Sequence, residues 1–155
     1  MRAFLALGSN LGDRAGNLRA AIDVIPDVVA ESNVYETEPV GGPDDQGAYF
    51  NMVVELDTTR SPRELLEVCR STETAGGRER VMHWGPRTID VDIIWIDGVT
   101  IDEPDLKIPH PLMHQRPFVL APFEELAPDV VPRHWRHELG DHGLKKLGNL
   151  DEVAR

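Results

Sequence analysis

Asp90 and Asp92 stand two residues apart within residues 89–96, a run that is otherwise apolar and mostly β-branched. Residues two apart in a strand point to the same face, so the two carboxylates would lie side by side, with Cα atoms about 6.5–7 Å apart. Two like charges beside aliphatic side chains are unfavourable without a counter-charge. Nearby arginines or a hard cation would supply it, and carboxylate ligands on an ion that keeps its waters are typical of Mg²⁺. A solvated pair at an exposed strand end is the alternative.

Basic residues concentrate just before the aspartates. Residues 60–87 hold six arginines against four glutamates, whereas the whole chain has 16 Lys and Arg against 27 Asp and Glu. Arginine forks match phosphate oxygens, and carboxylate-bound Mg²⁺ bridges phosphates. The two features together indicate a phosphoryl-transfer site, although the Gly-Lys-Ser/Thr sequence of a Walker A loop is absent. A solvated basic surface is the alternative for the arginines.

The composition bounds the class of protein. With 155 residues, 41% hydrophobic and 28% charged, the chain predicts one globular domain, residues 1–155, whose residues 132–155 form a C-terminal tail. The net charge of −11 argues against nucleic acid or an anionic membrane as a partner. One cysteine, Cys69, excludes an internal disulfide and favours a cytoplasmic location. No apolar run is long enough to span a bilayer, and the N-terminal apolar stretch is too short for a signal peptide.

Hydrophobic periodicity and breaker residues predict alternating strands and helices. Asp13 is placed to cap the first helix, and Ser61 with Glu64 forms a capping-box pattern before the second. The predicted elements in chain order are a strand over 2–7, a helix over 13–25, strands over 28–35 and 49–56, a helix over 61–77 and a strand over 89–96. This order is that of a ferredoxin-like α+β sandwich, an antiparallel sheet with helices covering one face.

The residues after the aspartates give further expectations. Asp97-Gly98 predicts a hairpin with a return strand over 99–101, residues 118–120 a last strand, and residues 142–150 a short helix. Period-two alternation also assigns the two faces of the aspartate strand. The aspartates share their face with Ile94 and Ile96, and the opposite, apolar face consists of Ile89, Val91, Ile93 and Trp95.

Several separated motifs follow one another along the chain. They are ALGSNLGD at 6–13, YET at 35–37, DQ at 45–46, YFN at 49–51, GPRTIDVDII at 85–94, PHP at 109–111 and RPFVL at 116–120. Together they resemble the motifs of the 6-hydroxymethyl-7,8-dihydropterin pyrophosphokinases, a family of folate-pathway enzymes. The resemblance implies a ferredoxin-like fold, with ATP and the reduced pterin as substrates. It also implies transfer of a diphosphoryl group to the hydroxymethyl oxygen, with AMP and the pterin diphosphate as products.

The resemblance further implies a role for each matching residue. Two Mg²⁺ ions would bind Asp90 and Asp92. The catalytic residues would be Arg78, Arg87, Asp90 and Asp92. The ATP contacts would come from Arg70, Glu73, Arg80, Trp84, Ile93, His110 and Arg116. The pterin pocket would consist of Thr37, Val40, Tyr49, Asn51 and Phe118. His83 departs from the family pattern, which has arginine immediately before the tryptophan.

The residue types at the implied pterin pocket suit that ligand. Tyr49 and Phe118 could sandwich a flat heterocycle, and Asn51 offers both a donor and an acceptor to its amide-like edge. Ordinary core packing of the two aromatic residues is the alternative. For the whole chain, two other functions stay open: a Mg²⁺-dependent nucleotide or diphosphate hydrolase, and a non-catalytic ligand-binding module. We expect a monomer.

Overall fold

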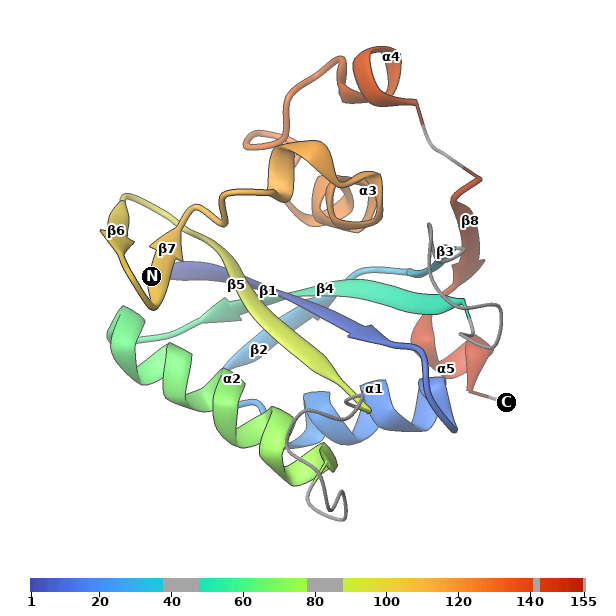
Figure 1. Ribbon diagram of the computed structural model, residues 1–155, viewed down its shortest axis with the longest axis horizontal. Coiled ribbons are helices and arrows are strands. Elements are labelled where there is room, and N and C mark those ends of the chain that lie inside the picture. Colours follow the sequence, from blue (N-terminus) through green and yellow to red (C-terminus); the bar gives the residue numbers. More distant parts are fainter. Residues whose placement is uncertain (38–47, 78–87, 141–142, 155) are drawn as a thin grey trace.

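A computed structural model describes residues 1–37, 48–77, 88–140 and 143–154. Its main sheet is antiparallel throughout and has the strand order β5-β1-β4-β3-β8, with β2 paired to β4 beside β3 (Figure 1). These strands are β1 (Arg2–Ser9), β2 (Val28–Glu31), β3 (Val34–Thr37), β4 (Tyr49–Asp57), β5 (Asp90–Ile96) and β8 (Lys145–Gly148). Without β8, this is the strand order of the ferredoxin-like sandwich, so the predicted fold class is confirmed.

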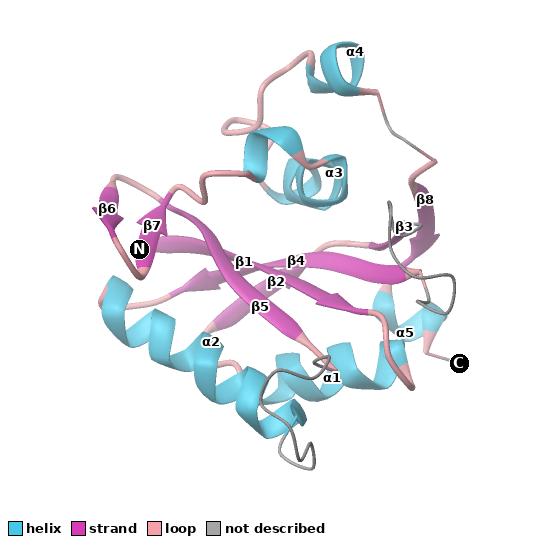
Figure 2. Cartoon of the chain, viewed as in Figure 1, coloured by secondary structure: helices cyan, strands magenta, loops and turns pink. Residues whose placement is uncertain are grey.

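Helices cover both faces of the sheet rather than the one face that was expected (Figure 2). On one side lie α1 (Arg14–Val24), α2 (Pro62–Gly77) and the short α5 (Leu150–Val153). On the other side lie α3 (Pro117–Leu126) and α4 (Trp135–Leu139), preceded by the 3₁₀ turn η1 (Met113–Gln115). Each side has its own apolar core, which we call the α1–α2 core and the α3 core. Among the described residues, no helix is long and apolar enough to cross a bilayer.

Both predicted helix caps are present. The Asp13 carboxylate accepts a hydrogen bond from the Gly16 amide at 3.0 Å, at the start of α1. Ser61 Oγ accepts from the Glu64 amide at 3.1 Å, and Glu64 Oε1 accepts from the Ser61 amide at 2.9 Å. These bonds satisfy amides that have no partner inside the helix. The caps therefore fix where the two helices begin beneath the sheet.

The predicted single strand over 28–35 is two strands, and Ser32 lies at the break. Its hydroxyl accepts a hydrogen bond from the Val53 amide at 2.9 Å, so the side chain takes a position that a backbone carbonyl would hold in a continuous strand. The chain then resumes pairing with β4 as β3, at the residues that lead into the predicted pterin pocket.

The predicted hairpin at Asp97-Gly98 is wrong. Residues 101–103 form β6 (Ile101–Glu103), which pairs with β7 (Leu106–Ile108) through a turn at Pro104-Asp105 instead of returning along β5. Other groups bind the outer edge of β5: the Glu73 side chain accepts from the Val91 amide at 2.9 Å, and the His110 amide donates to the Ile94 carbonyl at 3.1 Å. The sequence contains two turn signals, Asp97-Gly98 and Pro104-Asp105, and the hairpin forms at the second one.

The predictions for the C-terminal third also need correction. Residues 118–120 are the first turns of α3 and not a strand, because Pro117 at the first helical position favours a helix start and short apolar runs have no decisive period. Residues 142–150 were expected to be helical, but β8 occupies residues 145–148. β8 ends at Gly148, which has φ 115°. α5 follows, and the Asn149 side chain caps it by accepting a hydrogen bond from the Glu152 amide at 2.8 Å.

A β-bulge changes the predicted faces of β5. Phe4 pairs with Trp95 and Leu5 pairs with Ile93, so Ile94 is the extra residue. Asp90 and Asp92 keep their common face, as predicted. Beyond the bulge the alternation reverses: Trp95 packs with the α3 core and Ile96 belongs to the α1–α2 core. The period-two assignment of these last two residues was therefore wrong.

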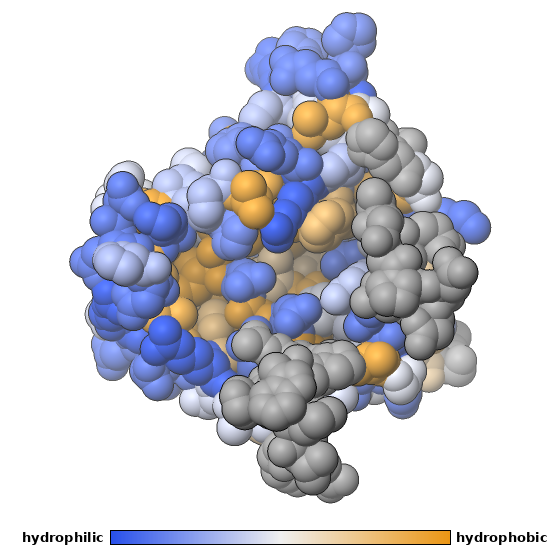
Figure 3. Space-filling view, viewed as in Figure 1, coloured by the Kyte–Doolittle hydropathy of each residue, from blue (hydrophilic) through white to orange (hydrophobic). Residues whose placement is uncertain are grey.

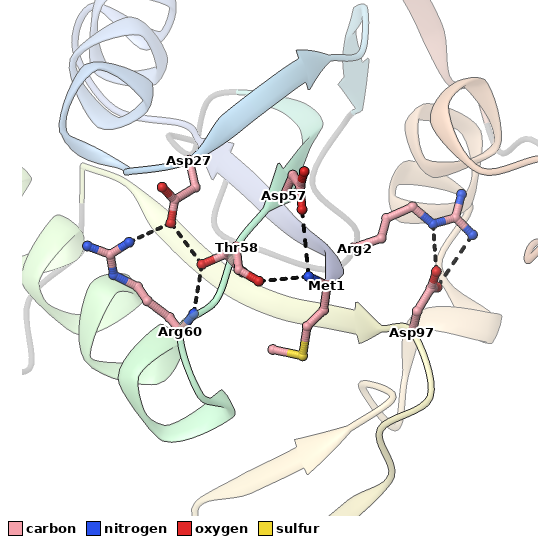
Figure 4. A network of polar contacts seen from close by, with 7 residues as sticks. All are labelled: Met1, Arg2, Asp27, Asp57, Thr58, Arg60 and Asp97. Carbon is pink, nitrogen blue, oxygen red and sulfur yellow. Dashed lines mark hydrogen bonds and ion pairs between the residues drawn. The ribbon is translucent and has the colours of Figure 1, made fainter.

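Polar contacts tie the strand ends together at the end of the sheet away from Asp90 (Figure 4). The Arg2 guanidinium pairs with Asp97 at 2.8 Å and with Asp129 at 2.8 Å, joining β1 to the end of β5 and to the segment after α3. Thr58 Oγ1 donates to Asp27 at 2.8 Å, which joins the end of β4 to the turn before β2. The Arg2, Asp97 and Asp129 side chains are partly exposed, so each of these ion pairs contributes little stability alone.

The capping box of α2 gives a stability prediction. Ser61→Ala should lower the free energy of unfolding by about 1 kcal/mol, because the Glu64 amide loses its acceptor. Ser71→Ala in the same helix is the control, since the Ser71 hydroxyl donates to the Glu67 carbonyl at 2.6 Å. Its removal should change stability by less than about 0.5 kcal/mol. Denaturant unfolding of both variants measures the difference, and equal losses would contradict the capping role.

Candidate active site

A row of residues crosses four strands on the α3 side of the sheet. Asp90 on β5 pairs with Gly8 on β1, Gly8 pairs with Asn51 on β4, and Asn51 pairs with Tyr35 on β3. A Cβ at Gly8 would lie 3.0 Å from Asn51 Oδ1 and 3.5 Å from Tyr49 Cδ1. Because Gly8 has no side chain, the Asn51 amide and the Tyr49 ring lie close against the β1 backbone, on a floor that continues across β1 to Asp90. A ligand could lie on this floor and reach both groups.

Asp92 occupies the next row, opposite Ala6 on β1. Its side chain is exposed, whereas Asp90 is partly buried. Burial first, and then the charge of Asp90, raises the pKa of Tyr49 above its usual value. The strand register sets Asp90 on the same face of the sheet as Asn51 and Tyr49. Asp92 lies beside a cavity at the outer edge of β5, the edge that is not paired with β1.

The two carboxylates suit Mg²⁺. They share a face, and their neighbours across β1 are a glycine and an alanine, so no large side chain from that strand covers them. Mg²⁺ binds one or two carboxylates and completes its shell with water and substrate phosphates. The described residues contain no group of three or more His, Cys, Asp or Glu that could hold a metal, so an all-protein cage is not formed there. A donor set of two acidic side chains fits an ion delivered with a nucleotide.

A cavity of about 240 Å³ opens at the outer edge of β5. Its walls come from α2, β5, the β6–β7 hairpin and the start of the Pro-His-Pro segment: Leu66, Cys69, Val91, Asp92, Ile93, Pro104, Asp105, Leu106, Lys107, His110 and Pro111. Three predicted nucleotide-site residues, Asp92, Ile93 and His110, are among them. The Val91 amide points outward to Glu73, and alternation along the edge strand gives the Ile93 backbone the same direction, toward this cavity.

The hairpin wall is the part of this cavity that sequence reasoning missed. Asp105 pairs with Arg63 at 2.7 Å, and the predicted residue Arg70 lies 3.8 Å from the same carboxylate. Arg70 also pairs with Glu67 at 3.3 Å, on its own helix. The charge pairs therefore fasten the hairpin to α2. The sequence signal that could have indicated this wall is the acidic turn at Pro104-Asp105, which precedes the Pro-His-Pro motif.

His110 lies at the mouth of the cavity with its imidazole partly buried. Burial lowers its pKa, the Asp92 charge opposes that shift, and the Arg116 charge adds to it. Its Nδ1 accepts a hydrogen bond from the Leu112 amide at 3.2 Å. A neutral ring with an acceptor at Nδ1 carries its proton on Nε2, so His110 can act as a hydrogen-bond donor at neutral pH.

The predicted pterin residues also gather on the α3 side. Asn51 Nδ2 donates to Thr37 Oγ1 at 3.0 Å, and Thr37 pairs with Tyr49 across the β3–β4 ladder. Asn51 is buried, whereas Tyr49 remains partly exposed. Phe118 lies at the start of α3, with the Arg116 guanidinium 5.7 Å from its ring centroid, and it too is partly exposed. Partial exposure of both aromatic rings favours a ligand surface over pure core packing.

The space-filling view shows apolar surface in the middle of this side of the molecule, interrupted by polar side chains and lying between the β6–β7 hairpin and α3 (Figure 3). The described part of the site thus has a cavity of about 240 Å³ at the outer edge of β5 and a polar floor on the α3 side of the sheet. Five predicted site residues lie outside the described residues: Val40, Arg78, Arg80, Trp84 and Arg87.

Comparison with known proteins shows the family of the chain. The family model described as 7,8-dihydro-6-hydroxymethylpterin-pyrophosphokinase matches residues 4–128. The chain belongs to this family. It is 40% identical over 160 residues to the 2-amino-4-hydroxy-6-hydroxymethyldihydropteridine pyrophosphokinase of Bacillus subtilis, covering 98% of this chain and 95% of that protein. It is 44% identical over 135 residues to the Methylorubrum extorquens protein of the same name, covering 84% and 85%.

A solved structure supports the fold. The crystal structure of Plasmodium falciparum HPPK-DHPS wild type aligns with a TM-score of 0.64 and 14% identity, covering 94% of this chain and 44% of that chain. At this low identity the likeness concerns the backbone arrangement alone. The ferredoxin-like fold of this pyrophosphokinase is thus supported by its own strand order and by a solved relative.

The lowered pKa of His110 gives a pH prediction for the pyrophosphokinase without nucleotide or metal. The neutral ring is favoured in the folded state, so its stabilising contribution is complete above the unfolded pKa of about 6.5 and is lost as pH falls below that value. His110→Asn keeps an acceptor for the Leu112 amide but cannot titrate. The free energy of unfolding, measured from pH 7.5 to pH 5, should fall more steeply for the wild type than for the variant. Parallel curves would refute the prediction.

Proposed function

We propose that the floor around Gly8 brings the two substrates of this pyrophosphokinase together. The reaction follows from the family: the enzyme transfers the diphosphoryl group of ATP to the hydroxymethyl oxygen of 6-hydroxymethyl-7,8-dihydropterin, for folate biosynthesis. The observation that carries the proposal is the register Asp90–Gly8–Asn51. It sets the acidic group on the nucleotide side and the amide on the pterin side of one floor.

ATP is proposed to bind with its base end in the cavity beside β5 and its phosphates toward Asp90 and Asp92. Arg70, Glu73, Ile93, His110 and Arg116 are assigned to the nucleotide. The backbone of Ile93 faces the base, and Nε2 of neutral His110 donates to phosphate oxygens. Arg78, Arg80, Trp84 and Arg87 are assigned to the same nucleotide from the family resemblance, with Arg78 and Arg87 binding the transferring phosphates.

Asp90 and Asp92 are proposed to hold two Mg²⁺ ions together with the phosphates. When bound, such ions neutralise phosphate charge and favour ionisation of an attacking hydroxyl. With the ions bound, the two aspartates would hold the phosphates at a fixed distance from the pterin floor, so that the transfer would become an effectively intramolecular step. Asp92 is exposed and Asp90 is only partly buried, which leaves room for water and phosphate oxygens to complete each ion's shell.

The pterin is proposed to lie between Tyr49 and Phe118, with its amide-like edge on Asn51 and with Thr37 and Val40 beside it. The Asn51–Thr37 hydrogen bond holds the Asn51 side chain in place, and its Oδ1 lies close against Gly8, where a Cβ would be only 3.0 Å away. A fixed amide presents donor and acceptor to the ligand without losing further side-chain entropy on binding. We further propose that the enzyme acts as a single-domain monomer in the cytoplasm.

The identity of the released nucleotide tests the reaction. Incubation with MgATP and the reduced hydroxymethylpterin should release AMP in equal amount to the pterin diphosphate. Chromatography of the nucleotides measures this directly. ADP that appears only with the pterin would contradict diphosphoryl transfer, and phosphate release without the pterin would indicate a hydrolase.

Neutralising either aspartate tests the metal proposal. Asp90→Asn and Asp92→Asn should each lower kcat by about 10²-fold or more, because a misplaced ion no longer stabilises the transition-state charge. Asp97→Asn, at the far end of the same strand, is the control and should leave kcat unchanged. Rate and Tm are measured on the same three proteins. If the carboxylates merely repel each other, the first two variants would gain stability and keep full activity.

Removing the amide or the aromatic ring tests the pterin pocket. Asn51→Ala should weaken pterin binding by about 1–3 kcal/mol, because the polar edge of the buried ligand loses its partner. Phe118→Ala should weaken it through lost stacking. Calorimetric titration with the pterin, and separately with a non-hydrolysable ATP analogue, measures both affinities. Equal losses for the two ligands would mean general disruption and not a pterin pocket.

A further inference from the structure

Arg14, in the first turn of α1, joins the ends of two strands. Its Nη1 donates to the Ala48 carbonyl at 2.7 Å and lies 3.3 Å from the Glu36 carboxylate. Its guanidinium carbon lies 3.8 Å from the centroid of the Phe50 ring. Glu36 and Phe50 are cross-strand partners on β3 and β4. One side chain therefore binds the last rungs of the β3–β4 ladder from the helix side of the sheet.

The next rung of this ladder belongs to the proposed pterin pocket. Thr37 pairs with Tyr49, and both side chains point to the α3 face because successive residues of a strand alternate. Phe50 belongs to the α1–α2 core, which confirms that Arg14 contacts the opposite face. Arg14 thus holds Glu36 and Phe50 on the helix side while their neighbours Thr37 and Tyr49 face the ligand.

We propose that Arg14 is a positioning residue for the pterin pocket, acting through the sheet from behind. The inference rests on the proposed function of Thr37 and Tyr49. By fixing the Glu36–Phe50 rung and the Ala48 carbonyl, Arg14 sets the separation of β3 and β4 where the ladder ends. The distance between Thr37 and Tyr49, and with it the position of Asn51 on Thr37, follows from that separation.

An arginine suits this position better than another cation. The planar guanidinium can stack on an aromatic ring while its edge donates to a carbonyl and a carboxylate, whereas a lysine ammonium offers no plane. The Arg14 and Glu36 side chains are 29% and 25% exposed, so solvent screens their attraction only in part. The carbonyl bond and the ring contact do not depend on that attraction.

Arg19, on the same helix, provides a matched control. It pairs with Glu31 at 3.0 Å and with Asp151 at 2.9 Å, and its side chain is 32% exposed, close to the 29% of Arg14. Arg19 thus also ties α1 to neighbouring elements through two partners. Its partners lie on β2 and α5, away from the Thr37–Tyr49 rung. Loss of helix anchoring alone should affect both arginine variants equally.

The test compares Arg14→Met, Arg14→Lys and Arg19→Met in the full chain. Calorimetry with the pterin, in the presence of a saturating non-hydrolysable MgATP analogue, should show the pterin Kd rising about tenfold for Arg14→Met. Arg14→Lys should recover part of that loss, and Arg19→Met should bind like the wild type. The Kd of the ATP analogue should stay within about twofold for all three. Hydrogen exchange should accelerate at the β3–β4 amides in Arg14→Met and not in Arg19→Met.

Each other outcome has a defined meaning. Equal weakening of pterin binding by Arg14→Met and Arg19→Met, or equal loss of both ligands in Arg14→Met, would overturn the positioning role. Unchanged pterin binding in Arg14→Met, with binding lost in Asn51→Ala, would overturn this inference and leave the pocket intact. Unchanged binding in Asn51→Ala would instead refute the proposed pocket itself.

Discussion

The antiparallel register of β1 between β5 and β4 is the constraint on which the site depends. It sets Gly8 between Asp90 and Asn51, and Ala6 between Asp92 and Val53. A slip of one residue on either side would turn these side chains to the opposite face, into the α1–α2 core. The apolar residues of β1 oppose that slip, because Leu5 and Leu7 are buried in that core and Phe4 is buried in the other. The two cores therefore specify the spatial relation between the acidic pair and the amide.

The two sides of the proposed site are held by different contacts. The proposed pterin side stands on the main sheet, where backbone hydrogen bonds, the Asn51–Thr37 bond and the α3 core hold it. Glu125 on α3 adds a link, since it accepts hydrogen bonds from the Tyr35 hydroxyl and, at 2.9 Å, from the Asn33 amide. This link ties the helix that carries Phe118 to the strand that carries Thr37. The aromatic ring and the polar floor are thereby held in one frame.

Much of this arrangement was predictable from residue spacing. The shared face of Asp90 and Asp92 and the two helix caps follow from short-range patterns, and the fold class follows from the order of the elements along the chain; the structure bears all of them out. The bulge at Ile94 was not predictable, because it depends on how β5 meets Phe4 and Leu5 across the sheet. The secondary structure of residues 118–120 was ambiguous because it too depends on tertiary contacts: a short apolar run takes its conformation from what it packs against.

The cavity proposed for the nucleotide has one wall that no sequence motif predicted. His110 and Asp92 belong to recognisable motifs, but the wall opposite them is the β6–β7 hairpin, a separate two-stranded sheet. An isolated two-stranded hairpin has little stability of its own. Here Leu106 and Ile108 are buried in the α1–α2 core and anchor the hairpin, and Arg63 on α2 adds contacts to Glu103 and Asp105. The three charged side chains are about half exposed, so salt screens their attraction.

Asp105 also lines the cavity that we propose for the base end of ATP. Its pairing with Arg63 and Arg70 offsets its negative charge there, so the hairpin contacts that pack against α2 also lower the negative charge of the proposed site.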